Sequence, residues 1–131
     1  LEFNCQYDGG VYAVFVSLGF ALWENISYVM SYGVSTAIVR AVTAIPGHAC
    51  FGVFMGVFYG AAKHMDRQGS ASASRLFRIL SLVVPALLHG AYDYIATTES
   101  GTLAFLGFVV VLFAASYLLV GQMSKNDRYI S

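Results

Sequence analysis

Four long apolar stretches divide this sequence and leave little choice of fold. Each stretch contains at most two Asp, Glu, Lys or Arg residues and reaches the length of about 20 residues that an α-helix needs to cross a bilayer. No segment shows the alternation of polar and apolar residues that a membrane β-barrel requires. The sequence therefore predicts an all-α, polytopic membrane bundle of about four transmembrane helices. The predicted spans cover approximately residues 9–32, 36–62, 76–97 and 102–123.

The small number of charged residues excludes an ordinary soluble domain. Only 11% of the residues are Asp, Glu, Lys or Arg, whereas a soluble domain carries roughly a quarter. The net charge is zero, so we expect no nucleic-acid partner. A lipid bilayer is the expected surrounding, and the expected location is the cell membrane.

The basic residues predict the orientation of the spans. Cytoplasmic loops collect Lys and Arg, so we expect a cytoplasmic loop at 63–75 and, with four spans, both termini of this segment in the cytoplasm. Six of the seven basic residues support this orientation, namely Lys63, Arg67, Arg75, Arg78, Lys125 and Arg128.

The whole of residues 1–131 is predicted to form one membrane-embedded domain. The sequence begins Leu-Glu-Phe-Asn-Cys, without an initiator Met, and we expect it to be part of a larger protein. Cys5 precedes the first predicted span and Cys50 lies within the second. This placement favours two free thiols over a disulfide framework.

Small residues recur at every fourth position on the first two spans. Gly9, Ala13, Ser17 and Ala21 form one row, and Ala44, His48, Gly52, Gly56 and Gly60 form the other. Small residues at this spacing let helix backbones approach closely in lipid. The rows predict tight helix packing, either within the chain or by self-association.

Ionisable side chains at membrane depth are the candidate functional residues. Glu24, Arg40, His48, His89 and Asp93 all lie within the predicted spans, where a charge costs several kcal/mol and is seldom present without a task. Such a set could activate water for hydrolysis, bind a metal ion, or relay protons or ions in a transporter. It could also form internal salt bridges that only fix helix packing.

Three sequence blocks resemble the PrsW family of membrane proteases. Residues 17–28, Ser-Leu-Gly-Phe-Ala-Leu-Trp-Glu-Asn-Ile-Ser-Tyr, closely resemble the family signature GFAxxENxxY, and Tyr7-Asp8-Gly9-Gly10-Val11-Tyr12 precede them. Arg40 with the Pro-Gly-His-Ala at 46–49 looks like a second block, and residues 82–93, which end in His-Gly-Ala-Tyr-Asp, look like a third. The resemblance extends from about residue 7 to residue 97 with the blocks in the family's order.

This resemblance implies a glutamic-type protease related to the CAAX prenyl endopeptidases, with no cofactor and with zinc as the alternative. The substrate would be a membrane-anchored regulator such as an anti-sigma factor, cut near the outer membrane face. Two alternatives to a protease stay open: a non-catalytic membrane scaffold of the same superfamily, or a metal- or ion-binding, transporter-like helical bundle. By position, the catalytic residues would be Glu24, His48, His89 and Asp93, with Asn25, Tyr28, Arg40 and Tyr92 in supporting roles.

One family motif has no counterpart in this chain. The family places a Glu-Glu pair, followed by a Lys, on the helix before the Tyr7-Asp8-Gly9 segment, where this chain has only Glu2. We therefore expect this segment alone to be inactive and the larger protein to be the enzyme.

Overall fold

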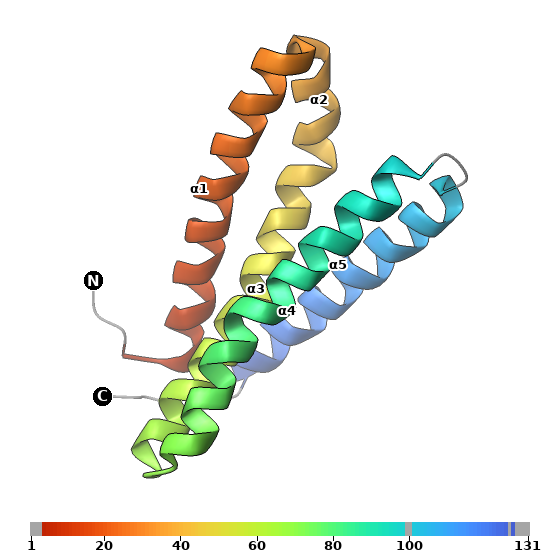
Figure 1. Cartoon of the computed structure of the whole chain (residues 1–131). Helices are drawn as coiled ribbons and strands as arrows, with labels where there is room; N and C mark the ends of the chain where they lie inside the picture. Colours follow the sequence, from red (N-terminus) through yellow and green to blue (C-terminus); the bar gives the residue numbers. More distant parts are fainter. Residues whose placement is uncertain (1–3, 99–100, 126, 128–131) are drawn as a thin grey trace.

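The computed structural model describes residues 4–98, 101–125 and 127, and these residues form five α-helices and no strand (Figure 1). The predicted all-α fold is confirmed. Four of the helices, all except α2, are long and apolar enough to cross a membrane, which supports a multi-pass membrane protein. The helices are α1 (Gln6–Tyr32), α2 (Val34–Val42), α3 (Ala44–Arg67), α4 (Ala71–Thr97) and α5 (Thr102–Lys125).

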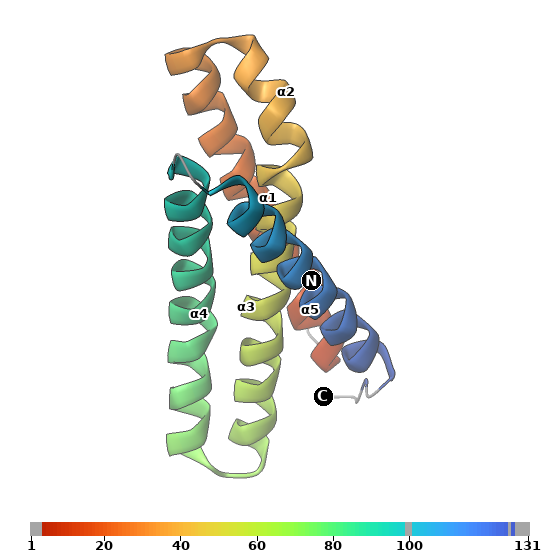
Figure 2. The same cartoon turned by 90° about the vertical axis from the view of Figure 1, so that its right-hand side faces the viewer.

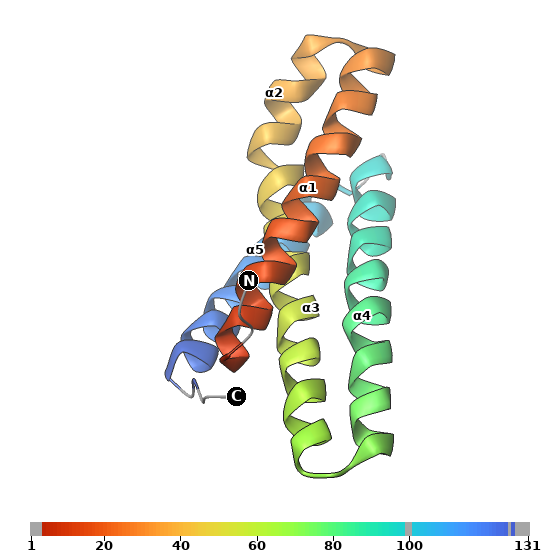
Figure 3. The same ribbon diagram turned by 90° about the vertical axis from the view of Figure 1, so that its left-hand side faces the viewer.

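Helix α3 is the centre of the bundle. Half of its most apolar window is buried within the chain, against 17% or less for α1, α4 and α5. Helices α1 and α4 both pack on α3 and meet each other only through side chains in the described residues, and α5 crosses α3 obliquely (Figures 2 and 3). Every other long helix is therefore positioned by its contact with α3.

The stretch predicted as one span over 36–62 is two helices, α2 and α3. The break is at Thr43, three residues before Pro46. Proline has no backbone N–H, and its ring clashes with the carbonyl of the residue four positions earlier, here Val42. Helix α2 therefore ends at Val42, and only α3 has the length of a span.

The connection between α3 and α4 is shorter than the predicted loop at 63–75. Helix α3 continues to Arg67 and α4 begins at Ala71, so only three residues remain between them. Gly69 has a φ of 75°, which glycine adopts readily and which lets the chain reverse there. Asp66 and Arg78 form an ion pair across the turn. The predicted loop at 63–75 is therefore wrong in length, because most of its residues belong to the end of α3 and the start of α4.

The two rows of small residues face each other across the α1–α3 interface. All four members of the α1 row and all five members of the α3 row are buried. A Cβ atom added at Gly52 would lie 2.6 Å from Cα of Val14, and one added at Gly56 would overlap the backbone of Gly10. The absence of side chains at these glycines lets the backbones touch.

Because these rows cover each other within one chain, self-association through them would require α1 and α3 to separate. The two cysteines agree with the prediction of free thiols: Cys5 is half-buried, Cys50 is buried, and neither forms a disulfide in the described part of the chain.

Both ends of the bundle have a distinct set of connections. The start of α1, the turn at residues 68–70 and the end of α5 lie toward one end (Figure 1). The α1–α2 turn at Gly33, the end of α4 and the start of α5 lie toward the other. We call the end of the bundle that contains the α1–α2 turn the hairpin end. This arrangement fits the predicted topology, although the direction of the chain across the membrane stays a prediction.

Substituting Gly52 with alanine should destabilise the protein. The added methyl group would force α1 away from α3, and such overpacking typically costs about 1–3 kcal/mol. The melting temperature in detergent should fall clearly for Gly52→Ala. Gly19→Ala on α1 is the matched control, because a Cβ atom there meets nothing within 4 Å. Equal melting temperatures for the two variants would contradict the close α1–α3 contact.

A cysteine at position 70 should be protected from a membrane-impermeant thiol reagent in intact cells, since the basic residues predict that the 68–70 turn is cytoplasmic. The test uses a background in which Cys5 and Cys50 are replaced by serine. Ser35→Cys, in the first turn of α2 at the hairpin end, should be labelled from outside. The reverse pattern would overturn the orientation.

Candidate active site

Glu24 is the centre of the ionisable group predicted from the sequence. Its Oε2 accepts a hydrogen bond from Nη2 of Arg40 at 2.5 Å and lies 3.0 Å from Nε2 of His48. Its other oxygen, Oε1, lies 3.6 Å from Nε2 of His89. Helices α1, α3 and α4 therefore bring one carboxylate and two imidazoles together, and α2 supplies the guanidinium.

Asp93 joins this group through His89, one turn earlier on α4. Oδ2 of Asp93 lies 3.3 Å from Nδ1 of His89, whereas Nε2 of the same ring faces Glu24. A carboxylate beside one ring nitrogen favours the tautomer with its proton there and leaves the lone pair of the other nitrogen free. The arrangement suits Asp93 as the residue that orients His89. We call Glu24, Arg40, His48, His89 and Asp93 the Glu24 cluster.

Burial within the Glu24 cluster follows a gradient. The side chain of His48 is 4% exposed, that of Glu24 is 18% exposed, and that of Asp93 is 47% exposed. Ser17 of the small-residue row donates a hydrogen bond of 2.6 Å to the backbone carbonyl of His48. The α1–α3 interface thus ends directly at the site, and the cluster becomes more open toward α4.

Two aromatic residues that the sequence analysis did not select form apolar walls of the site. The ring centroid of Phe20 lies 5.6 Å from that of His48 and 6.1 Å from that of His89. Phe51 lies at similar distances from both histidines. Phe20 is four residues before Glu24 and Phe51 is three after His48, so helical spacing could have found them. Apolar walls strengthen the electrostatic interactions that they enclose.

The supporting residues predicted from the family blocks have different surroundings. The guanidinium of Arg40 lies 3.8 Å from the centroid of the Tyr28 ring, in a cation–π contact. Tyr92 is buried and packs edge-on against Phe105. Asn25 has a buried Oδ1 with no hydrogen-bond partner among the described residues. Among Asn25, Tyr28 and Tyr92, the ring of Tyr28 is the one that contacts a side chain of the Glu24 cluster, that of Arg40.

The Glu24 cluster has the donor atoms of a divalent-metal site. Single ligand atoms of Glu24, His48 and His89 all lie within 4.8 Å of one another. Two imidazoles and one carboxylate are a common catalytic zinc set, which leaves a coordination position open. With neutral histidines, the two carboxylates and one guanidinium of the cluster leave one net negative charge, which a bound cation would balance. The residues present therefore fit a metal ion.

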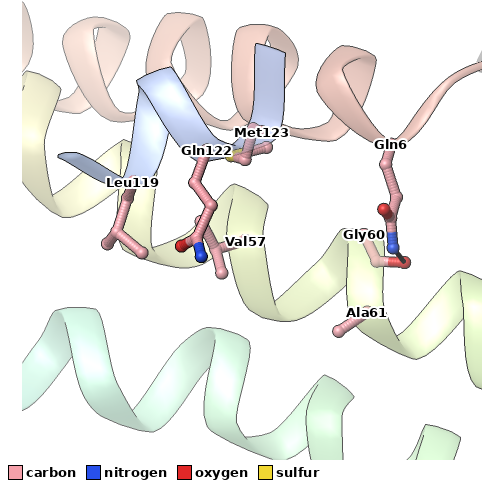
Figure 4. A pocket seen from close by; sticks show the side chains of 7 residues that line it. All are labelled: Gln6, Val57, Gly60, Ala61, Leu119, Gln122 and Met123. Carbon is pink, nitrogen blue, oxygen red and sulfur yellow. Dashed lines mark hydrogen bonds between the residues drawn. The ribbon is translucent and has the colours of Figure 1, made fainter. Parts of the chain in front are cut away.

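A separate pocket lies at the opposite end of the bundle. It has a volume of about 200 Å³ and lies between the first turn of α1, the second half of α3 and the end of α5 (Figure 4). The side chain of Gln6 donates a hydrogen bond to the backbone carbonyl of Gly60 at its edge. None of the predicted site residues lines this pocket.

The chain matches a family model described as PrsW family intramembrane metalloprotease over residues 1–120. It belongs to the PrsW family. This PrsW chain is 46% identical over 114 residues to a protein named Protease PrsW from Bacillus subtilis (strain 168), a match that covers 86% of the chain and 50% of that relative. No solved structure matches it.

Further relatives with the same name extend the similarity over nearly the whole chain. The protein from Geobacillus kaustophilus (strain HTA426) is 38% identical over 97% of this PrsW chain and 55% of its own length. The protein from Clostridioides difficile (strain 630) is 32% identical over 99% of the chain and 53% of its own length. The chain thus spans about half the length of the curated relatives it matches.

A full-length PrsW protein that contains this chain should bind Zn²⁺ through the Glu24 cluster. Calorimetric titration should show binding that is abolished in His48→Ala and in His89→Ala. Asp93→Asn should bind about 10- to 100-fold more weakly, because it leaves the ligands in place but removes the group that orients His89. His64→Ala is the matched control, since His64 contacts Gln68 near the other end of α3. Binding that is unchanged in all four variants would contradict a metal site here.

Proposed function

We propose that the longer protein containing this chain is a membrane-embedded peptidase that cleaves a membrane-anchored protein near the hairpin end of the bundle. The convergence of Glu24, His48 and His89 from three helices carries the proposal. Helix packing alone would need only the Arg40–Glu24 ion pair. It gives no reason to place a second imidazole beside Glu24 and a second carboxylate behind that imidazole.

Hydrolysis of a peptide bond requires an activated water molecule and stabilisation of the charge that develops on the carbonyl oxygen. Arg40 holds one oxygen of Glu24, and Asp93 is placed to hold one nitrogen of His89. Oε1 of Glu24 and Nε2 of His89 are thereby directed toward the same space. A divalent ion bound by Glu24, His48 and His89 would supply Lewis-acid polarisation of a carbonyl oxygen.

The glutamic-type, metal-free reaction that the sequence resemblance implied makes a different demand on Glu24. A general base needs a free oxygen at the reacting water. Oε2 of Glu24 already accepts a hydrogen bond from Arg40 and faces His48, so only Oε1, beside His89, is left for that role. We infer that Glu24 serves as a ligand or orienting group, that in a metal-free reaction the family's Glu-Glu pair supplies the main base, and that the 131-residue chain alone does not cleave.

The substrate class follows from the depth of the site. Glu24 lies eight residues before the end of α1, which corresponds to about 12 Å at 1.5 Å per residue. A peptide bond that reaches this depth belongs to a polypeptide anchored in the same membrane. We propose a single-span regulator, such as an anti-sigma factor, as the substrate.

The decisive experiment is co-expression of the full-length protein with a single-span anti-sigma factor tagged at both ends. The wild-type protein should generate two fragments on an immunoblot. Glu24→Gln, His48→Ala and His89→Ala should each reduce the cleavage rate at least about a hundredfold, as expected for loss of a group that activates water. His64→Ala should cleave normally.

Cleavage that survives all three substitutions would overturn the assignment of the active site. Absence of cleavage by the wild-type protein, with the substrate still co-purifying with it, would favour the scaffold reading. If a metal chelator abolishes wild-type cleavage and Zn²⁺ restores it, the reaction depends on a metal. Cleavage that is unchanged by the chelator would favour the glutamic-type reaction.

A further inference from the structure

A cavity of about 370 Å³ lies next to the Glu24 cluster at the hairpin end. Its walls come from the junction of α2 and α3, the last turns of α4 and the first turn of α5, which approach one another there (Figure 2). Arg40 and Asp93 belong to both the cavity wall and the Glu24 cluster. The Arg40 side chain therefore lies between the cavity and Glu24, and the Asp93 side chain lies between the cavity and His89.

We propose that this cavity binds an unwound stretch of the substrate polypeptide, on the side of the scissile bond that faces the hairpin end. The inference rests on the proposed function and adds where and how the substrate is held. Irregular backbone at membrane depth is tolerated only where it is buried in protein or lines a polar cavity, because lipid offers no hydrogen-bond partners. A peptide bond that is exposed for cleavage has left the helix, so its neighbours need such partners.

The cavity wall offers hydrogen-bond acceptors of the required kind. The hydroxyl groups of Thr43, Thr97 and Thr98 donate to backbone carbonyls of their own helices, at 2.9, 3.0 and 2.8 Å. Each hydroxyl oxygen keeps acceptor capacity after its proton is used. Thr97 and Thr98 therefore present acceptors that suit the N–H groups of an extended peptide, whereas the Thr43 hydroxyl is also engaged by Tyr92.

Arg40, which lines the wall, also carries a buried donor without a partner. Nε of Arg40 is buried and forms no hydrogen bond within the described residues, although Nη2 of the same side chain binds Glu24. An unpaired buried donor is unfavourable, and a small movement of the Arg40 side chain toward the cavity would let a substrate carbonyl oxygen accept from it. Donor and acceptors on one wall match a peptide backbone better than an apolar lipid chain.

The size of the cavity makes substrate selectivity the measurable consequence. Ala96 lines it from an exposed position of α4, so a larger side chain there would fill space without disturbing the core. Ala86 is also exposed on α4 but lines none of the pockets described above. Ala96→Trp and Ala86→Trp therefore form a matched pair.

The test uses the full-length protein and the tagged anti-sigma factor, with Gly, Leu or Trp placed beside the cleavage site on the hairpin-end side. Ala96→Trp should lower the rate for the Trp substrate relative to the Gly substrate by about tenfold or more, the scale of steric discrimination in a pocket. Ala86→Trp should keep the wild-type ratio. A general folding defect would lower all three rates together and leave the ratio unchanged.

A second measurement covers the case in which Ala96→Trp does not fold. Ala96→Cys should cross-link, through a short bis-maleimide, to a cysteine in the substrate stretch beside the cleavage site, and Ala86→Cys should not. Two outcomes would overturn the role of the cavity and leave the proposed function standing, provided that the wild-type protein cleaves. One is an unchanged Trp-to-Gly ratio in a folded Ala96→Trp, and the other is no cross-link from position 96. Absence of wild-type cleavage on every substrate would overturn the proposed function, and the inference with it.

Discussion

The direct backbone contact between α1 and α3 is the constraint on which the rest of the structure depends. Lipid supplies no hydrophobic drive for helices to associate, so close packing and interhelical hydrogen bonds must do so. Gly52 and Gly56 allow the backbone of α1 to lie where side chains would otherwise be. Ser17 then donates to the backbone carbonyl of His48 and sets the register of the two helices. That register places Glu24, two turns farther along α1, beside the His48 ring.

Burial of the Glu24 cluster is costly, and the arrangement of its charges reduces that cost. An isolated carboxylate at this depth would be strongly unfavourable. The guanidinium of Arg40 bonds to Glu24 and rests on the ring of Tyr28, so the cation is also partly shielded by an aromatic face. Among the two carboxyl side chains and the guanidinium of the cluster, that of Asp93 is the most exposed. The excess negative charge therefore lies toward the open side of the site, where a cation or a substrate could reach it.

Hydropathy predicted most of the fold, and the differences arise where local geometry outweighs it. The first and last spans agree with α1 and α5 to within a few residues. The second span was predicted to begin too early, because an apolar average does not register the backbone clash that Pro46 causes. The loop over 63–75 was predicted too long, because Gly69 and the Asp66–Arg78 ion pair permit a three-residue turn between two well-formed helices.

The sequence by itself determined that the chain is an all-helical membrane protein, that small residues line α1 and α3, and which ionisable residues lie at membrane depth. These properties are local: each depends on residue type and on spacing along one helix. The sequence also placed Asp93 beside His89, since one turn of α4 joins them. Only the tertiary structure decided that Glu24 meets both histidines, that Arg40 pairs with Glu24 and not with Asp93, and that Phe20 and Phe51 enclose the site. Those contacts depend on how α1, α2 and α4 are placed around α3, and the periodicity of a single helix carries no information about the helices it will touch.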